Sequence, residues 1–508
     1  MKIRPALGRL AGLLLLGLSP GLLAFAPKTG DTSPEPPVLN LDPLQVRAAI
    51  AAAGDDPRRY AVGVDINQGL DAGLWSSSPE TQTWTLDIAS EGALSLSLQL
   101  TGVALPAGAR LSLADVQGEV VHALNPQADG RLWTPPVPGA HARLQLALPY
   151  PATPDTPQLL IAKAYHGDRA LYAPKALGDA GSCNVDVACP PGDNWRDEIR
   201  AAVMVTVDVA NGRIRCSGTL LNNSAFNNRP YVLTARHCQI NNDNAASVNL
   251  IFNFENPTCG VDAPTLSTSQ ALSGSAVCAV SEAADTLLVE STDPEAEAKL
   301  AAFEAYFAGW NAVNGATPQS GVSLHHPRSD AKKISTYSQP GVQASQTFTN
   351  PSFTAETWRI TWDEGVTEPG SSGAGLWNQD RQVTGVLSGG SSSCDARSEP
   401  DFFGRLDVAW GDSAELRSHL DPVGAGTTQT LCGRNPADAQ CAGADPMPGT
   451  LATETSEPPR PVCALQGAAM ESRQTASGGG GAPDPRLLLL LLACALAGAR
   501  LRRAPTAG

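Results

Sequence analysis

Eleven cysteines lie in this chain of 508 residues, and all of them follow residue 182. They stand at positions 183, 189, 216, 238, 259, 278, 394, 432, 441, 463 and 494. No two form a Cys-x-x-Cys pair, and the nearest His is His237, beside Cys238, so we expect no metal site. In an exported chain such cysteines indicate disulfides. The distribution therefore predicts a disulfide-bonded domain that follows a module without cysteine.

The first 26 residues indicate export. Lys2, Arg4 and Arg9 accompany an apolar run from Leu10 to Leu23, and Ala24-Phe25-Ala26 has the small-x-small form of a signal-peptidase site. The alternative, an N-terminal membrane anchor, needs about 20 apolar residues, and this run is shorter. We expect a signal peptide over residues 1–26.

The far end of the chain resembles a sorting tail. Four glycines at 478–481 are followed by the apolar run Leu487 to Ala499 and by Arg500, Arg502 and Arg503. This pattern is similar to the GlyGly-CTERM signal, which implies transient membrane contact and cleavage by a rhomboid-type protease. A short permanent anchor is the alternative, with the basic end cytoplasmic. We expect a tail over residues 481–508.

Composition limits the partners. The chain has 35 Lys and Arg against 50 Asp and Glu, a net charge of −15, and no basic block, so nucleic acid is not expected to bind. Residues 176–424 carry 29 acidic residues against 3 Lys and 12 Arg, a net of −14. Only 7 residues of the whole chain are Lys, for which a GC-rich genome is one explanation. Cationic partners fit this charge best.

Alternating polar and apolar residues dominate the middle of the chain. The runs Thr83 to Ile88 and Leu94 to Leu100 predict a small antiparallel β domain, which we assign to a β-rich propeptide over residues 27–175. From residue 183 strands dominate again, which indicates an all-β barrel or sandwich. The clearest expected strands are 202–209, 231–234, 248–254, 286–289 and 383–387, and the best helix candidates are 294–308 and 413–420. The composition of residues 425–480 predicts a linker with a small loop closed by Cys432 and Cys441.

Two segments together indicate nucleophilic catalysis. Tyr231 to Cys238 is an apolar strand that ends in His237 and Cys238, which suits a rigidly held general base. Glu368-Pro369-Gly370-Ser371-Ser372-Gly373 places Ser372 on a tight turn, where the N–H groups of Gly370 and Ser372 can converge on an oxyanion. Either segment alone is weak, and the combination is strong.

A carboxylate must orient the imidazole. Asp285 leads directly into an apolar strand and is the best placed, whereas Asp262 and Asp293 lie in polar surroundings. The resulting order is His237, Asp285, Ser372, which differs from the order in α/β-hydrolases and in subtilisins.

Several motifs together resemble the bacterial lysyl endopeptidases, in the same order and over residues 181–424. They are Gly181 to Pro190, Leu233 to Cys238, Asp285 to Leu288, His325-His326-Pro327, Val366 to Gly373 and Phe403-Gly404-Arg405. The resemblance implies a secreted serine protease with a chymotrypsin-like double β-barrel over residues 176–424 and no cofactor. It also implies disulfides joining Cys183 to Cys394, Cys189 to Cys259 and Cys216 to Cys238, and it gives Cys278 no partner.

The resemblance also predicts the residue that reads the substrate. Val366 stands six residues before Ser372, where trypsin-type enzymes carry an acid, so that arrangement is absent. The family instead implies Asp401 at the base of the S1 pocket, with Gly389 beside it. Trp362 matches a Trp at the pocket rim, but Ser388 replaces the family's His, so the stacked pair is not expected. Lys is the first choice at P1, and Arg is the second. The alternative is that Asp401 is an ordinary surface residue in an acidic stretch.

Processing and activity complete the expectations. Lys175 stands eight residues before Cys183, where the family's propeptide is removed after a Lys, although an ordinary exposed Lys is an alternative. We expect a monomeric, exported endopeptidase that acts on polypeptides and binds its own propeptide. The rivals are a protease of Arg or broader P1 choice, and an inactive surface-displayed binding protein on the same fold.

Overall fold

The computed structural model describes residues 35–118, 120–149, 156–169, 180–263, 266–439, 441 and 463. The expected signal peptide, the processing region around Lys175 and the sorting tail lie outside them. The helices and strands all belong to one compact unit that begins at Pro37. Over the described residues, no helix combines the length and the apolar character that crossing a bilayer requires.

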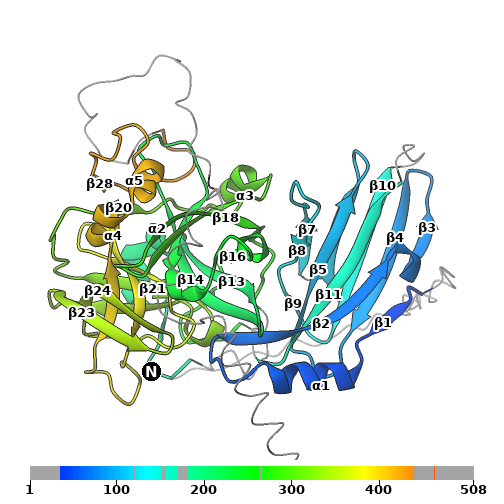
Figure 1. The fold of residues 1–508 in the computed structure, drawn as a ribbon, viewed down its shortest axis with the longest axis horizontal. Helices are drawn as coiled ribbons and strands as arrows, with labels where there is room; N and C mark the ends of the chain where they lie inside the picture. Colours follow the sequence, from blue (N-terminus) through cyan, green and yellow to red (C-terminus); the bar gives the residue numbers. More distant parts are fainter. Residues whose placement is uncertain are drawn as a thin grey trace, which may run out of the picture. The chain divides into compact units, whose positions relative to one another are not determined.

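An N-terminal β module precedes the cysteine-containing part of the chain (Figure 1, blue to cyan). One of its sheets contains β1 (Val38–Asn40), β3 (Leu74–Ser77), β4 (Thr81–Ala89), β6 (Arg110–Asp115), β7 (Val121–Leu124) and β10 (His141–Pro149). The other strands are β2 (Arg59–Gly69), β5 (Ser95–Ala104), β8 (Leu132–Trp133), β9 (Val137–Pro138) and β11 (Gln158–Gly167). The alternating residues of β4 and β5, such as Trp84 and Leu98, bury their apolar side chains in one shared core, as the sequence predicts.

A barrel-like sheet follows, and it carries the strand that leads to His237. Its strands are β13 (Ala202–Val209), β14 (Gly212–Leu221), β15 (Tyr231–Ala235), β16 (Asn249–Ile251), β17 (Ala271–Ser273), β18 (Ser275–Ser281) and β19 (Thr286–Ser291). Most residues of β13, β14 and β15 are buried, as expected for strands covered on both faces.

A second barrel-like sheet carries the turn with Ser372. Its strands are β12 (Val185–Asp186), β20 (Gly309–Asn311), β21 (Gly321–His325), β22 (Lys333–Tyr337), β23 (Val342–Thr349), β24 (Ser352–Ile360), β25 (Gly375–Trp377), β26 (Gln382–Gly390), β27 (Asp401–Arg405) and β28 (Thr430–Leu431). The α-helices are short: α1 (Pro43–Ala52), α2 (Arg196–Ile199), α3 (Ala296–Ala302), α4 (Leu406–Asp412) and α5 (Ala414–Leu420). The expected all-β class with barrel-like sheets is confirmed.

The N-terminal module and the first barrel share one sheet, which the sequence analysis did not predict. Strand β2 pairs antiparallel with β14, through Ala61 opposite Arg213 and Arg59 opposite Ile214. Beside this junction the Tyr165 hydroxyl donates to Asp208 over 2.8 Å. The module therefore extends the barrel sheet rather than standing apart from it.

The start of the expected linker at 425–480 is not a linker. β28 pairs with β20, and the buried Arg434 donates to Asn222 and Asn228. The sequence appeared polar and linker-like there because its contacts are hydrogen bonds to residues about 200 positions away. Cys432 and Cys441 do close the expected small loop.

Candidate active site

His237 and Asp285 meet because two neighbouring strands pair. β15 and β19 run antiparallel with Ala235 opposite Thr286, which brings the residues after one strand next to the residue before the other. The Asp285 carboxylate, 1% exposed, lies 2.7 Å from His237 Nδ1 and also accepts the His237 backbone N–H over 2.9 Å. This carboxylate fixes the ring with Nδ1 as the donor. Asp285 also has a φ of +48°, a strained conformation that is common at functional sites.

The other two candidate acids lie elsewhere. Asp262 accepts a hydrogen bond from Asn256, and Asp293 forms an ion pair with Lys299 over 2.7 Å. Among the described residues, neither contacts His237, so the geometry favours Asp285.

The strand end that carries His237 is held from two sides. The disulfide between Cys216 and Cys238 fastens the next residue to β14. From the N-terminal module, Arg58 Nη1 donates to the His237 carbonyl oxygen over 2.8 Å in a buried contact. Sequence reasoning missed Arg58, because nothing local indicates a partner 179 residues away.

Ser372 sits on the turn that the glycines predict. Its carbonyl oxygen accepts the Ser217 N–H over 2.7 Å, and the Cys238 sulfur lies 3.9 Å from the same oxygen. The side chain is partly exposed, and within the described residues no hydrogen bond joins its hydroxyl to His237. Catalytic hydrogen bonds are often absent before substrate binds.

The turn leaves two amides available. In the part of the chain that the structure describes, the N–H groups of Gly370 and Ser372 donate to no other residue. Gly370 has a φ of +102°, and a Cβ there would lie 2.9 Å from the His326 carbonyl oxygen, so only glycine fits. Two free N–H groups on one turn are suited to stabilise an oxyanion.

A chain of buried hydrogen bonds holds the turn that carries Ser372. The hydroxyl of Ser371, next to the nucleophile position, lies 2.8 Å from His325 Nδ1, and His325 Nε2 lies 3.1 Å from the Ser335 hydroxyl. Ser335 in turn donates to the Val366 carbonyl oxygen over 2.9 Å. Burial and the nearby Lys333 lower the pKa of His325 to about 3, so this imidazole stays neutral and structural.

Asp401 is buried where strands β26 and β27 pair. β27 begins at this residue, opposite Gly390 of β26, and a Cβ on Gly390 would lie 2.0 Å from the Asp401 carboxylate. Asp401 is 1% exposed and accepts hydrogen bonds from Trp362 (2.7 Å), Thr367 (2.8 Å) and Ser392 (2.6 Å). Burial raises the pKa of Asp401, although these hydrogen bonds oppose the shift. No Lys or Arg of the described residues forms an ion pair with it.

The expected rim residues are arranged differently. Trp362 is buried and donates its indole N–H to Asp401, so it lies at the carboxylate rather than at the rim. Ser388 is buried, and its hydroxyl has no hydrogen-bond partner among the described residues. A Cβ on Gly389 would lie 3.1 Å from the ring of Phe348, so that ring packs closely against Gly389.

A stacked aromatic pair exists, built from residues that the sequence analysis missed. The Phe353 ring stacks on the His237 ring with centroids 5.5 Å apart and planes 13° apart, and Phe348 stacks on Phe353 at 4.7 Å. Both residues come from the β23–β24 hairpin, whose alternating polar sequence gives no sign of this contact.

The disulfides follow the pairing that the resemblance implies, with one addition. Cys183 bonds to Cys394, Cys189 to Cys259 and Cys216 to Cys238. Cys278, for which no partner was expected, bonds to Cys463. The bond fastens a residue of the linker range to β18.

Known proteins are similar in sequence to this chain. Residues 177–404 match the family model for the lysyl endopeptidase C-terminal domain. A lysyl endopeptidase of Pseudomonas aeruginosa is 32% identical over 345 residues, which cover 63% of this chain and 72% of that protein. The chain belongs to the lysyl endopeptidase family. It is a serine endopeptidase, and its substrates are polypeptides.

Solved serine protease structures are also similar to parts of this lysyl endopeptidase family member. The active form of the Rv3671c protease from M. tuberculosis is 15% identical with a TM-score of 0.30, covering 45% of this chain and 86% of that one. The thermostable serine protease AL20 is 11% identical with a TM-score of 0.28, covering 42% and 94%.

Proposed function

We propose that this endopeptidase cleaves peptide bonds after a basic residue, preferably Lys. The observation that carries the proposal is the buried carboxylate of Asp401, which forms no ion pair with any residue that the structure describes. An uncompensated buried charge is unfavourable, so a P1 ammonium that pairs with it gains the energy that selects the substrate. Arg at P1 is the second candidate, since a guanidinium offers the same charge.

The proposed chemistry uses His237, Asp285 and Ser372. Ser372 Oγ attacks the carbonyl carbon of the scissile bond, and His237 Nε2 takes its proton while Asp285 stabilises the imidazolium. The N–H groups of Gly370 and Ser372 bind the oxyanion. His237 then protonates the leaving amine as the acyl-enzyme forms. His237 then takes a proton from a water molecule that attacks the ester carbonyl, and it returns this proton to Ser372 Oγ as the acyl–oxygen bond breaks and the acid is released.

We also propose a preproenzyme that is exported and processed. Residues 27–175 would form the propeptide, cleaved after Lys175, and residues 176–424 the protease domain. The pairing of β2 with β14 and the contact from Arg58 to His237 support a role for the module in folding the first barrel. The disulfides fit an oxidising compartment. The mature enzyme would be monomeric, with a removable tail at 481–508.

A fluorophosphonate probe separates this proposal from an inactive binding protein. The processed protein should be labelled at Ser372, and Ser372→Ala should remain unlabelled. Absence of label on the processed wild-type protein would contradict the assignment of Ser372 as nucleophile.

A further inference from the structure

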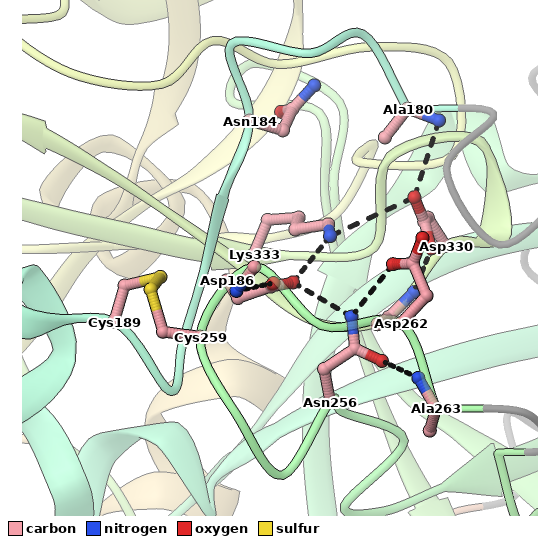
Figure 2. Close-up of polar contacts among 12 residues, drawn as sticks. Ala180, Asn184, Asp186, Cys189, Asn256, Cys259, Asp262, Ala263, Asp330 and Lys333 are labelled. Atoms are coloured by element: carbon pink, nitrogen blue, oxygen red, sulfur yellow. Dashed lines mark hydrogen bonds and ion pairs between the residues drawn. A yellow bond between two sulfur atoms is a disulfide. The ribbon is translucent and has the colours of Figure 1, made fainter.

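The segment that follows the expected processing region is anchored by buried charges. Figure 2 shows Ala180 donating its N–H to Asp330 over 3.4 Å, and Lys333 lying between Asp330 and Asp186. The Lys333 ammonium is 2.5 Å from Asp186 and 3.9 Å from Asp330. Residues 180–186 are therefore docked on the second barrel and not merely attached to it.

The next residue reaches the catalytic turn itself. The Gly181 N–H donates to Glu368 Oε2 over 2.8 Å, and Asn184 Nδ2 donates to the same oxygen over 2.8 Å. Glu368 Oε1 accepts from Arg328 Nε over 2.8 Å. The Glu368 side chain is 7% exposed, so all three bonds hold a shielded carboxylate, where charge-assisted hydrogen bonds are strong.

Glu368 stands two residues before Gly370, whose N–H is one of the two free oxyanion donors. The intervening Pro369 carbonyl oxygen accepts the Arg328 N–H over 2.7 Å. Arg328 and Ser329 have φ values of +50° and +65°, and their loop packs directly behind Gly370. Through these hydrogen bonds Glu368 joins the Arg328 loop to residues 181–184. The orientation of the Gly370 amide therefore depends on them.

We propose that Glu368 is a positioning residue of the oxyanion hole, and that Gly181 and Asn184 are part of its support. Glu368 touches neither substrate nor nucleophile; it acts by fixing the peptide that leads to Gly370. The inference rests on the proposed function of Gly370 and Ser372. It assigns a catalytic purpose to a segment otherwise seen only as the beginning of the protease domain.

The test compares Glu368→Gln with Asn184→Ala in the processed, disulfide-bonded enzyme. Removing an oxyanion donor costs about 10²–10³ in kcat, so misplacing one should cost about 10- to 100-fold for Glu368→Gln and less for Asn184→Ala. KM should stay within about 2-fold, because the acid that binds P1 is untouched. In the double variant, Asn184→Ala should add little to the loss in kcat caused by Glu368→Gln, because both changes break the same set of hydrogen bonds.

Two ligands separate positioning from general damage. A peptide aldehyde ending in lysine forms a hemiacetal with an oxyanion, so its affinity should fall in parallel with kcat. Binding of n-butylammonium, which needs only the basic-residue pocket, should not change. Glu198→Gln provides the matched control, since Glu198 is also a shielded carboxylate, 1% exposed and paired with Arg381, and it should keep wild-type kcat.

An unchanged kcat in Glu368→Gln would overturn the proposal. So would equal losses of aldehyde and n-butylammonium affinity, which would indicate only a structural role. If Glu368→Gln fails to fold, Asn184→Ala alone decides, because it leaves the carboxylate and the Arg328 contact in place. Failure of the proposed function is a different result, since the wild-type enzyme would then not react with fluorophosphonate.

Discussion

Asp401 is the single residue on which the proposed specificity depends. Asp401→Asn keeps the size and most hydrogen bonds but removes the charge, so kcat/KM for lysyl substrates should fall about 10³-fold. Cleavage after a neutral P1 residue should not fall with it. Steady-state kinetics on matched substrates measure both.

The matched control lies in the same acidic stretch. Glu399 is exposed, so Glu399→Gln should leave kcat/KM for lysyl substrates unchanged. Equal kinetics for Asp401→Asn and Glu399→Gln would mean that Asp401 takes no part in substrate selection.

The same carboxylate predicts a pH dependence. Burial raises the pKa of Asp401 above the ordinary value of 3.8, so its charge, and with it the attraction for a P1 cation, is lost as the pH falls through that raised pKa. Changes in the catalytic groups shared by all substrates affect every substrate alike. The ratio of kcat/KM for a lysyl substrate to that for a neutral substrate should therefore decline on acidification, and should stay flat in Asp401→Asn. A flat ratio in the wild-type enzyme between pH 7 and pH 4 would contradict this role.

At the scale of elements, the β23–β24 hairpin brings aromatic rings onto the catalytic base. Phe353→Ala removes a stacking contact of about 0.5–1.5 kcal/mol beyond area burial, so kcat should fall about 3- to 10-fold. Val342→Ala, an exposed change on the same hairpin, should have no effect. Peptide hydrolysis rates and melting temperatures check the pair, and a loss of melting temperature without a loss of kcat would show that Phe353 serves only the hairpin.

Elements were predictable where the signal is local. The strand 202–209 and the strand before His237 follow from their apolar runs, and Asp285 follows from its place before another such run. The pairing of β2 with β14, the stack of Phe353 on His237 and the burial of Arg434 were not predictable. Each joins residues far apart in the sequence, and each uses side chains that look like ordinary surface or linker residues when read alone. The expected 248–254 strand is shorter, β16 being Asn249–Ile251.

At the scale of the whole molecule, the few lysines of residues 176–508 are arranged in a way that limits self-cleavage after lysine. Lys299 pairs with Asp293, Lys332 is fully buried against Glu255, and Lys333 is buried against Asp186. The sequence contains no lysine after Lys333. Within residues 176–508 a lysine-directed enzyme therefore meets only the partly exposed, ion-paired Lys299 and two buried lysines, whereas Lys175 lies immediately before them.

This pattern predicts the products of self-processing. Intact-mass analysis of the purified enzyme should find a chain that begins at Ala176 and is uncut at 425–480, while Ser372→Ala should retain the N-terminal module covalently. Release of the tail would then require a protease of another specificity. Additional cuts after Arg473 in the wild-type enzyme alone would contradict the preference for Lys over Arg in self-processing.

The central claim is that Ser372 cleaves after a residue chosen by the charge of Asp401. Cleavage-site profiling of a denatured proteome by the processed enzyme tests it most directly. The account predicts Lys at P1 in most cuts, with Arg second and with the preference lost in Asp401→Asn. Equal use of Lys and Arg would show that Ser388 leaves the pocket open to both, and cuts spread over apolar P1 residues would contradict the claim.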